Sequence, residues 1–185
     1  MGFSSRVYHW VGLVNWVILS LLLAAAGSRA EDFRLESAGG RYGFPVDHRS
    51  QGFSQAEAFV NWNLPWQWEP GADWRLQSRL DASAGWLGRG RSDAALITLG
   101  PTLVLGYKQL PLSLDAGASL TGLSRDEFGS KNLGSLFQIS SHAGFNWDFA
   151  SHLRVGYHFQ HMSNAGIRAP NPGLNLHVFA VSYLF

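Results

Sequence analysis

Hydrophobic and polar residues alternate with a period of two along most of the chain after residue 30. In 73–86, Trp, Leu and Ala occupy most even positions, and charged or polar residues occupy most odd ones. The segments 95–107, 112–120 and 137–147 alternate in the same way. Because successive side chains of a β-strand point to opposite faces, each segment predicts a strand with one apolar and one polar face.

Four further segments bring the expected number of strands to eight. The alternation is weaker near 31–38 and 54–64, and stronger near 151–163 and 175–185. Most of these segments run for about 10 to 14 residues, whereas globular strands favour about 5–6 and membrane strands need about 9–11. The pattern therefore predicts an all-β fold, an eight-stranded antiparallel transmembrane β-barrel over residues 31–185.

A soluble β-sandwich or a soluble ligand-binding barrel would alternate in the same way, but with more charge on its water-facing side. Charged residues make up only 15% of this chain, and aromatic residues make up 14%. The alternating aromatic end from Phe179 to Phe185 resembles the recognition signal of outer-membrane barrels. Six tryptophans near strand ends are typical of interfacial girdles: Trp62, Trp66, Trp68, Trp74, Trp86 and Trp147.

The connections between strands are expected to be short at one end of the barrel and longer at the other, as in outer-membrane barrels. Short connections are predicted near 65–71, 108–110 and 149–150. Longer ones are predicted near 39–53, 124–133 and 164–174, with one of intermediate length near 87–93. With both termini periplasmic, 164–174 becomes the last extracellular loop.

Charged residues on the inward faces are expected to form a packed polar network, because a barrel of eight strands has little internal space. A structural role is favoured over a catalytic one for this network. Its expected members are Glu57, Arg75, Arg79, Asp81, Asp115 and Arg154.

The first thirty residues have the pattern of an export signal. Arg6 precedes an apolar stretch over 11–27, and the small residues Ser28 and Ala30 fit a signal-peptidase site. We predict that 1–30 is a signal peptide cleaved after Ala30. An uncleaved membrane anchor is the alternative, for which this stretch is marginal because Asn15 interrupts it.

Charge and composition narrow the functional classes. The formal net charge of +1, without a block of like charges, gives no sign of a nucleic-acid partner. The absence of cysteine excludes a disulfide framework, a thiolate metal site and a cysteine nucleophile. The histidines are scattered and no acidic cluster accompanies them, so no metal and no cofactor are expected.

Three polar residues fall on lipid-facing positions of the alternating pattern, at the outer ends of the last two strands. His161 and Ser163 continue one apolar face, and Asn175 is in phase with the other. Polar groups facing lipid are costly unless they are partnered or used. A serine becomes nucleophilic when an imidazole takes its proton, and the imidazole needs a third group to fix its tautomer. The pattern favours acyl transfer over an interfacial His and Ser that merely touch headgroups.

The residues around this pair read His-Met-Ser-Asn-Ala-Gly over 161–166 and Pro-Asn-Pro-Gly over 170–173. This motif resembles that of the PagL family of lipid A 3-O-deacylases, most sharply over 153–185. The resemblance implies that Ser163 is the nucleophile and His161 the base, on the outside of the barrel. It also implies a glutamate at the position of Asn175, whose amide oxygen can accept Nδ1–H but stabilises an imidazolium less.

The loop after the pair contains candidate oxyanion-hole donors: Asn164, Gly166 and Asn171, through backbone N–H or carboxamide groups. The same residue types also favour tight loop geometry, which is the preferred role for Gly173. Asn175 is expected to orient His161 more weakly than a glutamate would; the alternatives are that another carboxylate reaches the ring or that the protein is inactive. Asp126 and Glu127, on a neighbouring external loop, are poor candidates for that role.

The sequence therefore predicts an esterase of the Gram-negative outer membrane. The resemblance implies that it removes an ester-linked acyl chain, at the 3 position, from the lipid A of lipopolysaccharide. A homodimer is compatible with the sequence, which does not decide the oligomeric state. The main alternative is a non-catalytic barrel for adhesion or envelope anchoring.

Overall fold

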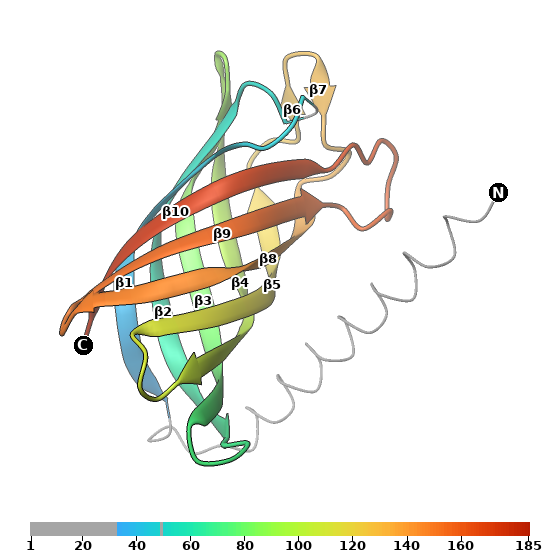
Figure 1. Ribbon diagram of the computed structural model, residues 1–185. Helices are drawn as coiled ribbons and strands as arrows, with labels where there is room; N and C mark the ends of the chain where they lie inside the picture. The colour runs from blue at the N-terminus through green and yellow to red at the C-terminus, as the bar shows by residue number, and fades with distance from the viewer. Residues whose placement is uncertain (1–32, 49) are drawn as a thin grey trace.

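The computed structural model describes residues 33–48 and 50–185, which form a closed antiparallel barrel (Figure 1). The predicted fold class and the eight barrel strands are confirmed. The barrel strands are β1 (Arg34–Pro45), β2 (Phe53–Trp68), β3 (Trp74–Arg89), β4 (Ser92–Tyr107), β5 (Leu112–Leu123), β8 (Phe137–Ala150), β9 (Leu153–Ser163) and β10 (Leu174–Leu184). A separate hairpin contains β6 (Glu127–Phe128) and β7 (Lys131–Asn132). The predicted signal peptide lies outside the described residues.

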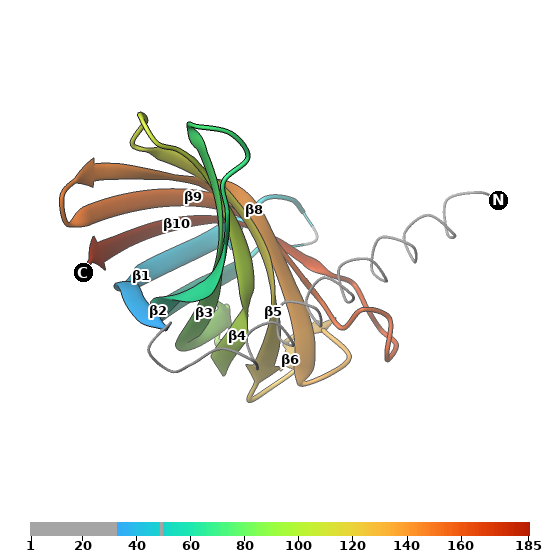
Figure 2. The ribbon, with the colours of Figure 1, turned by 90° about the horizontal axis from the view of Figure 1, so that it is seen from below.

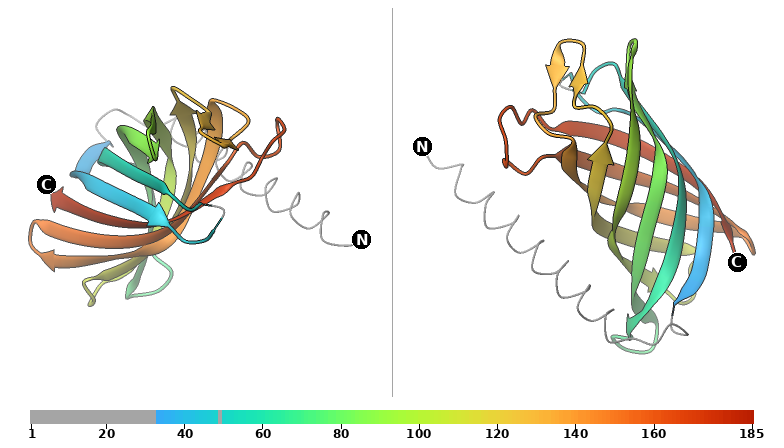
Figure 3. Two further views of the ribbon diagram at one scale, coloured as in Figure 1. Left: turned by 90° about the horizontal axis from the view of Figure 1, so that it is seen from above. Right: turned by 180° about the vertical axis from the view of Figure 1, so that it is seen from behind.

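Each barrel strand pairs with the next barrel strand along the chain, β5 pairs with β8 across the separate β6–β7 hairpin, and β1 pairs with β10 to close the barrel. The short turns 69–73, 108–111 and 151–152 lie on the side of the carboxyl terminus, as Figure 2 shows. The β6–β7 hairpin and the 164–173 loop lie at the opposite end (Figure 3). The described residues contain no helix long and apolar enough to cross a membrane.

The period of two separates an apolar outer face from a polar inner one. On β4, Ile97 and Leu99 are 64% and 51% exposed, whereas Thr98 between them is 7% exposed. The same contrast recurs around the barrel, where large apolar side chains are left open on the outside. A soluble monomer rarely exposes so large an apolar area, and lipid is the solvent that suits it.

Charged side chains fill the interior toward the end that carries the carboxyl terminus. Arg41 donates to both carboxylate oxygens of Glu57, at 2.9 and 3.0 Å, and to Asp81 at 3.3 Å. Further ion pairs tie strands together there: Arg79 with Glu36 and Asp115, and Arg154 with Glu36 and Asp148. Five of the six predicted members are in this network, and Arg41, Glu36 and Asp148 are additional members.

Arg75 was predicted inside the barrel, and this prediction is wrong. Its side chain is 44% exposed and lies 3.6 Å from Glu69 in the β2–β3 turn. Lys108 donates to the same carboxylate at 3.0 Å, and this hydrogen bond lowers the pKa of Glu69. Arg75 is next to the first residue of β3, so it lies at the rim of the barrel rather than within it.

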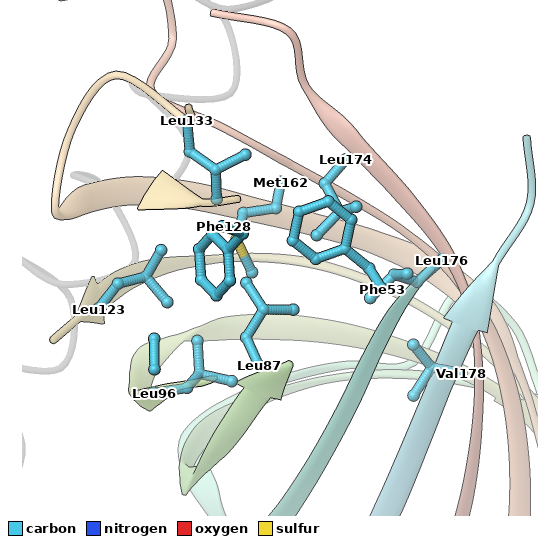
Figure 4. Close-up of a cluster of buried hydrophobic side chains, with 11 residues drawn as sticks. Phe53, Leu87, Leu96, Leu123, Phe128, Leu133, Met162, Leu174, Leu176 and Val178 are labelled. Carbon is cyan, nitrogen blue, oxygen red and sulfur yellow. The ribbon is translucent and has the colours of Figure 1, made fainter. Parts of the chain in front are cut away.

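An apolar cluster, which we call the plug, fills the interior at the opposite end (Figure 4). Phe128 of the β6–β7 hairpin is fully buried there and packs edge-on against Phe53, with ring centroids 5.3 Å apart. The plug consists of Phe53, Leu87, Ala94, Leu96, Leu123, Phe128, Leu133, Met162, Leu174, Leu176 and Val178. The hairpin therefore folds over the mouth of the barrel and supplies apolar contacts to it.

Two predicted connections are shorter than expected. The loop predicted over 39–53 is confined to 46–52, because β1 continues to Pro45. The connection predicted over 87–93 is a two-residue turn at 90–91, where Gly90 adopts a φ of 64°. Glycine tolerates that conformation, so both strands run up to the turn.

Candidate active site

The candidate residues meet where β9 and β10 reach the plug end of the barrel. His161 on β9 pairs in register with Asn175 on β10. Ser163 is the last residue of β9. On its other side His161 pairs with Ser141 of β8, so it lies between two neighbouring strands.

The plug holds these residues on the outer face. Met162, between His161 and Ser163, is 1% exposed and belongs to the plug. Leu174 and Leu176 flank Asn175 and are buried in the same cluster. Because alternate side chains of a strand point to opposite faces, the anchored apolar residues leave His161, Ser163 and Asn175 facing outward.

A hydrogen bond fixes the tautomer of the His161 ring. His161 Nδ1 lies 2.7 Å from Asn175 Oδ1. A carboxamide oxygen only accepts, so Nδ1 must carry the hydrogen and the neutral ring keeps a free lone pair on Nε2. This is the tautomer in which the imidazole can take a proton from a serine.

The carboxamide of Asn175 has a second partner. Its Nδ2 donates to Asp47 Oδ2 at 2.8 Å, from the loop between β1 and β2. Asp126 and Glu127, the carboxylates considered from the sequence, lie elsewhere: Glu127 accepts from Asn132 within the β6–β7 hairpin. The sequence alone does not predict this contact of Asp47, because a loop residue has no alternating pattern that would show which way its side chain points.

Ser163 and His161 lie two residues apart on one face of β9, about 6.6 Å between their backbones. Within the described residues, the Ser163 hydroxyl makes no hydrogen bond to His161. Catalytic hydrogen bonds are often long in the absence of substrate. Ser141 is a second hydroxyl beside the ring, because directly opposed residues on antiparallel strands have Cβ atoms about 4.5–5.5 Å apart.

Asn164 organises the loop that follows Ser163. Its side chain is fully buried, and its Nδ2 lies within 3.1 Å of the carbonyl oxygens of Leu133, Arg168 and Pro170. Its Oδ1 accepts from Gly166 N at 3.0 Å. These contacts join the loop to the β6–β7 hairpin and to the plug.

Two of the N–H groups predicted as oxyanion donors already have acceptors. Gly166 N donates to Asn164 Oδ1, and Asn164 N donates to Asn171 Oδ1 at 3.2 Å. Within the described part of the chain, the N–H of Ala165 and the Nδ2 of Asn171 have no acceptor. Ala165 adopts a positive φ of 53°, which turns the backbone sharply just after Ser163.

Gly173 lies against the His161 ring. A Cβ at this position would lie 3.0 Å from His161 Cε1, and the φ of 67° is one that favours glycine. Gly173 therefore serves the turn, as the sequence predicts, and also leaves room for the imidazole.

The described residues contain no group of three or more His, Cys, Asp or Glu side chains placed to hold a metal ion. The geometry that is present is a histidine oriented through a carboxamide, beside two hydroxyls. Such an arrangement can perform acid–base and nucleophilic chemistry.

Comparison with known protein families shows which family the chain belongs to. The family model described as Lipid A 3-O-deacylase (PagL) matches residues 55–184, more than two thirds of the chain. The chain belongs to this family. The resemblance found in the motif at 161–166 is thereby confirmed, and the match also covers most of β2 and all of β3 to β8.

Two curated relatives match in part. The lipid A deacylase PagL of Bordetella bronchiseptica is 38% identical over 72 residues, which cover 39% of this chain and 40% of the relative. The protein of the same name from Pseudomonas aeruginosa is 34% identical over 61 residues, covering 33% and 35%. The chain thus spans about two fifths or less of the length of the curated relatives it matches.

A crystal structure of the outer-membrane enzyme PagL is similar in fold. The TM-score is 0.66 and the identity 22%, with 80% of this chain and 97% of that chain covered. Family membership and the closed barrel with its apolar outer face together identify an outer-membrane protein of the lipid A deacylase family.

Proposed function

We propose that this protein hydrolyses the ester-linked acyl chain at the 3 position of lipid A, with Ser163 as nucleophile and His161 as general base. The observation that carries the proposal is the 2.7 Å hydrogen bond between His161 Nδ1 and Asn175 Oδ1, on the outer face beside Ser163. This bond leaves Nε2 free to accept a proton. A histidine and a serine on a lipid-facing surface are costly there unless they are used.

The reaction proceeds in two steps. His161 Nε2 takes the Ser163 hydroxyl proton while Oγ attacks the ester carbon, and the resulting oxyanion collapses to break the bond to the sugar oxygen. The expelled oxygen takes the proton from His161, and the acyl chain remains on Ser163. A water molecule deprotonated by His161 then attacks the acyl carbon, and Ser163 Oγ leaves and takes the proton back from His161 as the fatty acid is released.

The negative oxygen of the intermediate needs hydrogen-bond donors. We propose that the loop 164–173 supplies them. The candidates are Ala165 N–H and Asn171 Nδ2, which have no acceptor within the described residues. Asn164 and Gly166 become donors only if substrate binding exchanges their present bonds within the loop.

We place the site at the outer leaflet, with the acyl chain against the outer face of β9, β10 and β1. Below the site this face is aromatic: Phe44 stacks on Phe179 with ring centroids 5.6 Å apart. Two polar side chains of this face pair with each other, since Tyr157 Oη lies 2.8 Å from His177 Nδ1. An apolar chain can therefore lie along this face with few groups left unpaired.

Mass spectrometry of lipid A from cells expressing the protein tests the proposal. The unmodified protein should remove one ester-linked acyl chain, and Ser163→Ala should leave lipid A intact while the barrel still folds. Ser141→Ala is the matched control, because it removes the other hydroxyl beside His161 and should leave deacylation unchanged. An unaltered lipid A mass with the unmodified protein would instead support the non-catalytic alternative.

A further inference from the structure

We propose that Asp47 is a positioning residue of this site: it fixes the orientation of the Asn175 carboxamide and, through it, the tautomer of His161. The inference rests on the proposed hydrolase function and adds a member to its machinery. It follows from a chain of two hydrogen bonds, Asp47 Oδ2 to Asn175 Nδ2 at 2.8 Å and Asn175 Oδ1 to His161 Nδ1 at 2.7 Å.

Two residues of the loop between β1 and β2 bind the backbone N–H and C=O of Asn175. Val46 N donates to the Asn175 carbonyl at 3.1 Å, and Asn175 N donates to Ser50 Oγ at 2.8 Å. Asp47 Oδ1 accepts from Ser50 N at 2.9 Å, which leaves Oδ2 directed at the Asn175 side chain. These bonds hold the carboxylate of Asp47 beside the Asn175 side chain.

A carboxamide can bind in either of two orientations, and an ionised carboxylate removes the choice. Both oxygens of a carboxylate only accept, so Asn175 must present its NH₂ group to Asp47. Its oxygen is then left for His161, whose Nδ1 must carry the hydrogen. Without Asp47, the carboxamide could rotate and offer NH₂ to Nδ1, which would favour the tautomer with the hydrogen on Nε2. That tautomer cannot take a proton from Ser163.

The negative charge of Asp47 also supplies what a neutral carboxamide lacks. During attack His161 becomes an imidazolium, which a nearby anion stabilises. In this chain the anion, Asp47, contacts the His161 ring only through Asn175. The glutamate that the family resemblance implies at position 175 would contact the ring directly. Asp47 and Asn175 together thus take the place of a single acidic residue.

This arrangement predicts that the effect of a substitution at position 175 depends on the residue at position 47. Asn175→Glu alone would place a second carboxylate within hydrogen-bond distance of Asp47, and two carboxylates so close cannot both be ionised without cost. Asp47→Asn in that background removes the repulsion and lets the new amide donate to Glu. The double variant moves the charge next to His161 and keeps one carboxylate in the pair.

The test compares turnover of purified lipid A by the full protein and four variants: Asp47→Asn, Asn175→Glu, the double variant, and Asp126→Asn as a control carboxylate on another loop. Asp47→Asn should lower kcat by about 10- to 100-fold, by analogy with the effect of removing the partners that orient metal-binding histidines. KM should change little, and Asp126→Asn should behave as the unmodified protein.

The sign of the Asp47 effect separates positioning from a merely structural role. In the Asn175→Glu background, Asp47→Asn should raise kcat; a role limited to loop structure would lower it in both backgrounds. An Asp47→Asn variant with unchanged kcat, or the same loss in both backgrounds, overturns the inference.

A nitrogen-15 NMR measurement of the His161 ring tests the same point without turnover. The unmodified protein should show the hydrogen on Nδ1, and Asp47→Asn should shift the ring toward the other tautomer. An identical ring spectrum in both proteins overturns the role of Asp47. Absence of turnover in the unmodified protein would count against the proposed function, while the ring spectrum would still decide the role of Asp47.

Discussion

The two ends of the barrel interior are filled by different kinds of side chain, charged at one end and apolar at the other. Toward the carboxyl terminus, Arg41, Arg79 and Arg154 pair with carboxylates across the strands. Toward the loops, the plug contains apolar side chains and the buried Phe128. Both fill the same narrow barrel, yet the candidate active site lies on the outer face of the apolar end alone.

The contrast between the two ends indicates how a site on the outside of a barrel is kept in place. Ion pairs link many strands but hold any one side chain through a few directed bonds. A close-packed apolar cluster resists movement on all sides, because any displacement opens a void. Met162 and the leucines flanking Asn175 are part of the plug, so the register of β9 against β10 is held from within. We infer that the charged end holds the barrel closed and the plug holds the site.

The largest effect on stability is expected from Arg41→Ala. It leaves the buried carboxylates of Glu57 and Asp81 without their cation, and breaking a buried pair in this way costs about 3–5 kcal/mol. Urea unfolding of the refolded barrel in detergent micelles measures the loss. The folded fraction should keep its deacylase activity, and a large loss of activity per folded molecule would contradict the division between the two ends.

Truncation of the plug beneath the site comes next. Met162→Ala should lower the free energy of unfolding by about 2–5 kcal/mol and also lower kcat, because the cavity frees the end of β9. Leu96→Ala, in the same cluster but on β4, is the matched control. It should destabilise the barrel to a similar degree with little effect on kcat. Equal losses of kcat in the two variants would show that the plug does not act locally.

Gly173→Ala should affect activity more than stability. The positive φ costs an alanine about 1 kcal/mol, while the new Cβ presses on His161 Cε1. A displacement of the ring by a few tenths of an ångström or more should lower kcat, by up to about 100-fold for a shift of 1 Å. Gly71→Ala, at a φ of 87° with open space around it, should show a similar backbone cost and unchanged kcat.

The smallest effect is expected from Arg75→Ala. Its ion pair with Glu69 lies at the rim, and both side chains are well exposed, so solvent screens the interaction. The urea midpoint and the deacylase rate should both match those of the unmodified protein. A midpoint as low as that of Arg41→Ala would restore Arg75 to the interior network.

Alternation alone predicts the outward direction of His161, Ser163 and Asn175, because a period of two leaves no other choice within a strand. It fails for Arg41, since glycines at 39, 40 and 43 interrupt the apolar pattern and suggest a loop. The structure shows why residue 39 is a glycine: a Cβ there would overlap the Val181 carbonyl oxygen. The glycine permits β1 to approach β10 where the barrel closes.

Asp47 could not be predicted for a different reason. It lies 128 residues from Asn175 along the chain, and only the pairing of β1 with β10 brings them together. The loop between β1 and β2 has no periodicity that would direct its side chains. The contacts of Asn164 with Leu133 and Pro170 likewise depend on the packing of two loops, which spacing along the chain does not encode.

The central claim is that Ser163 is a nucleophile activated by His161, and covalent labelling tests it most directly. The folded barrel in detergent is treated with an alkyl fluorophosphonate, which reacts with activated serines, and the labelled peptide is identified by mass spectrometry. We expect one adduct, on Ser163, and a much slower reaction in His161→Asn. An adduct on Ser141 instead, or labelling of Ser163 at the same rate without His161, would contradict the account.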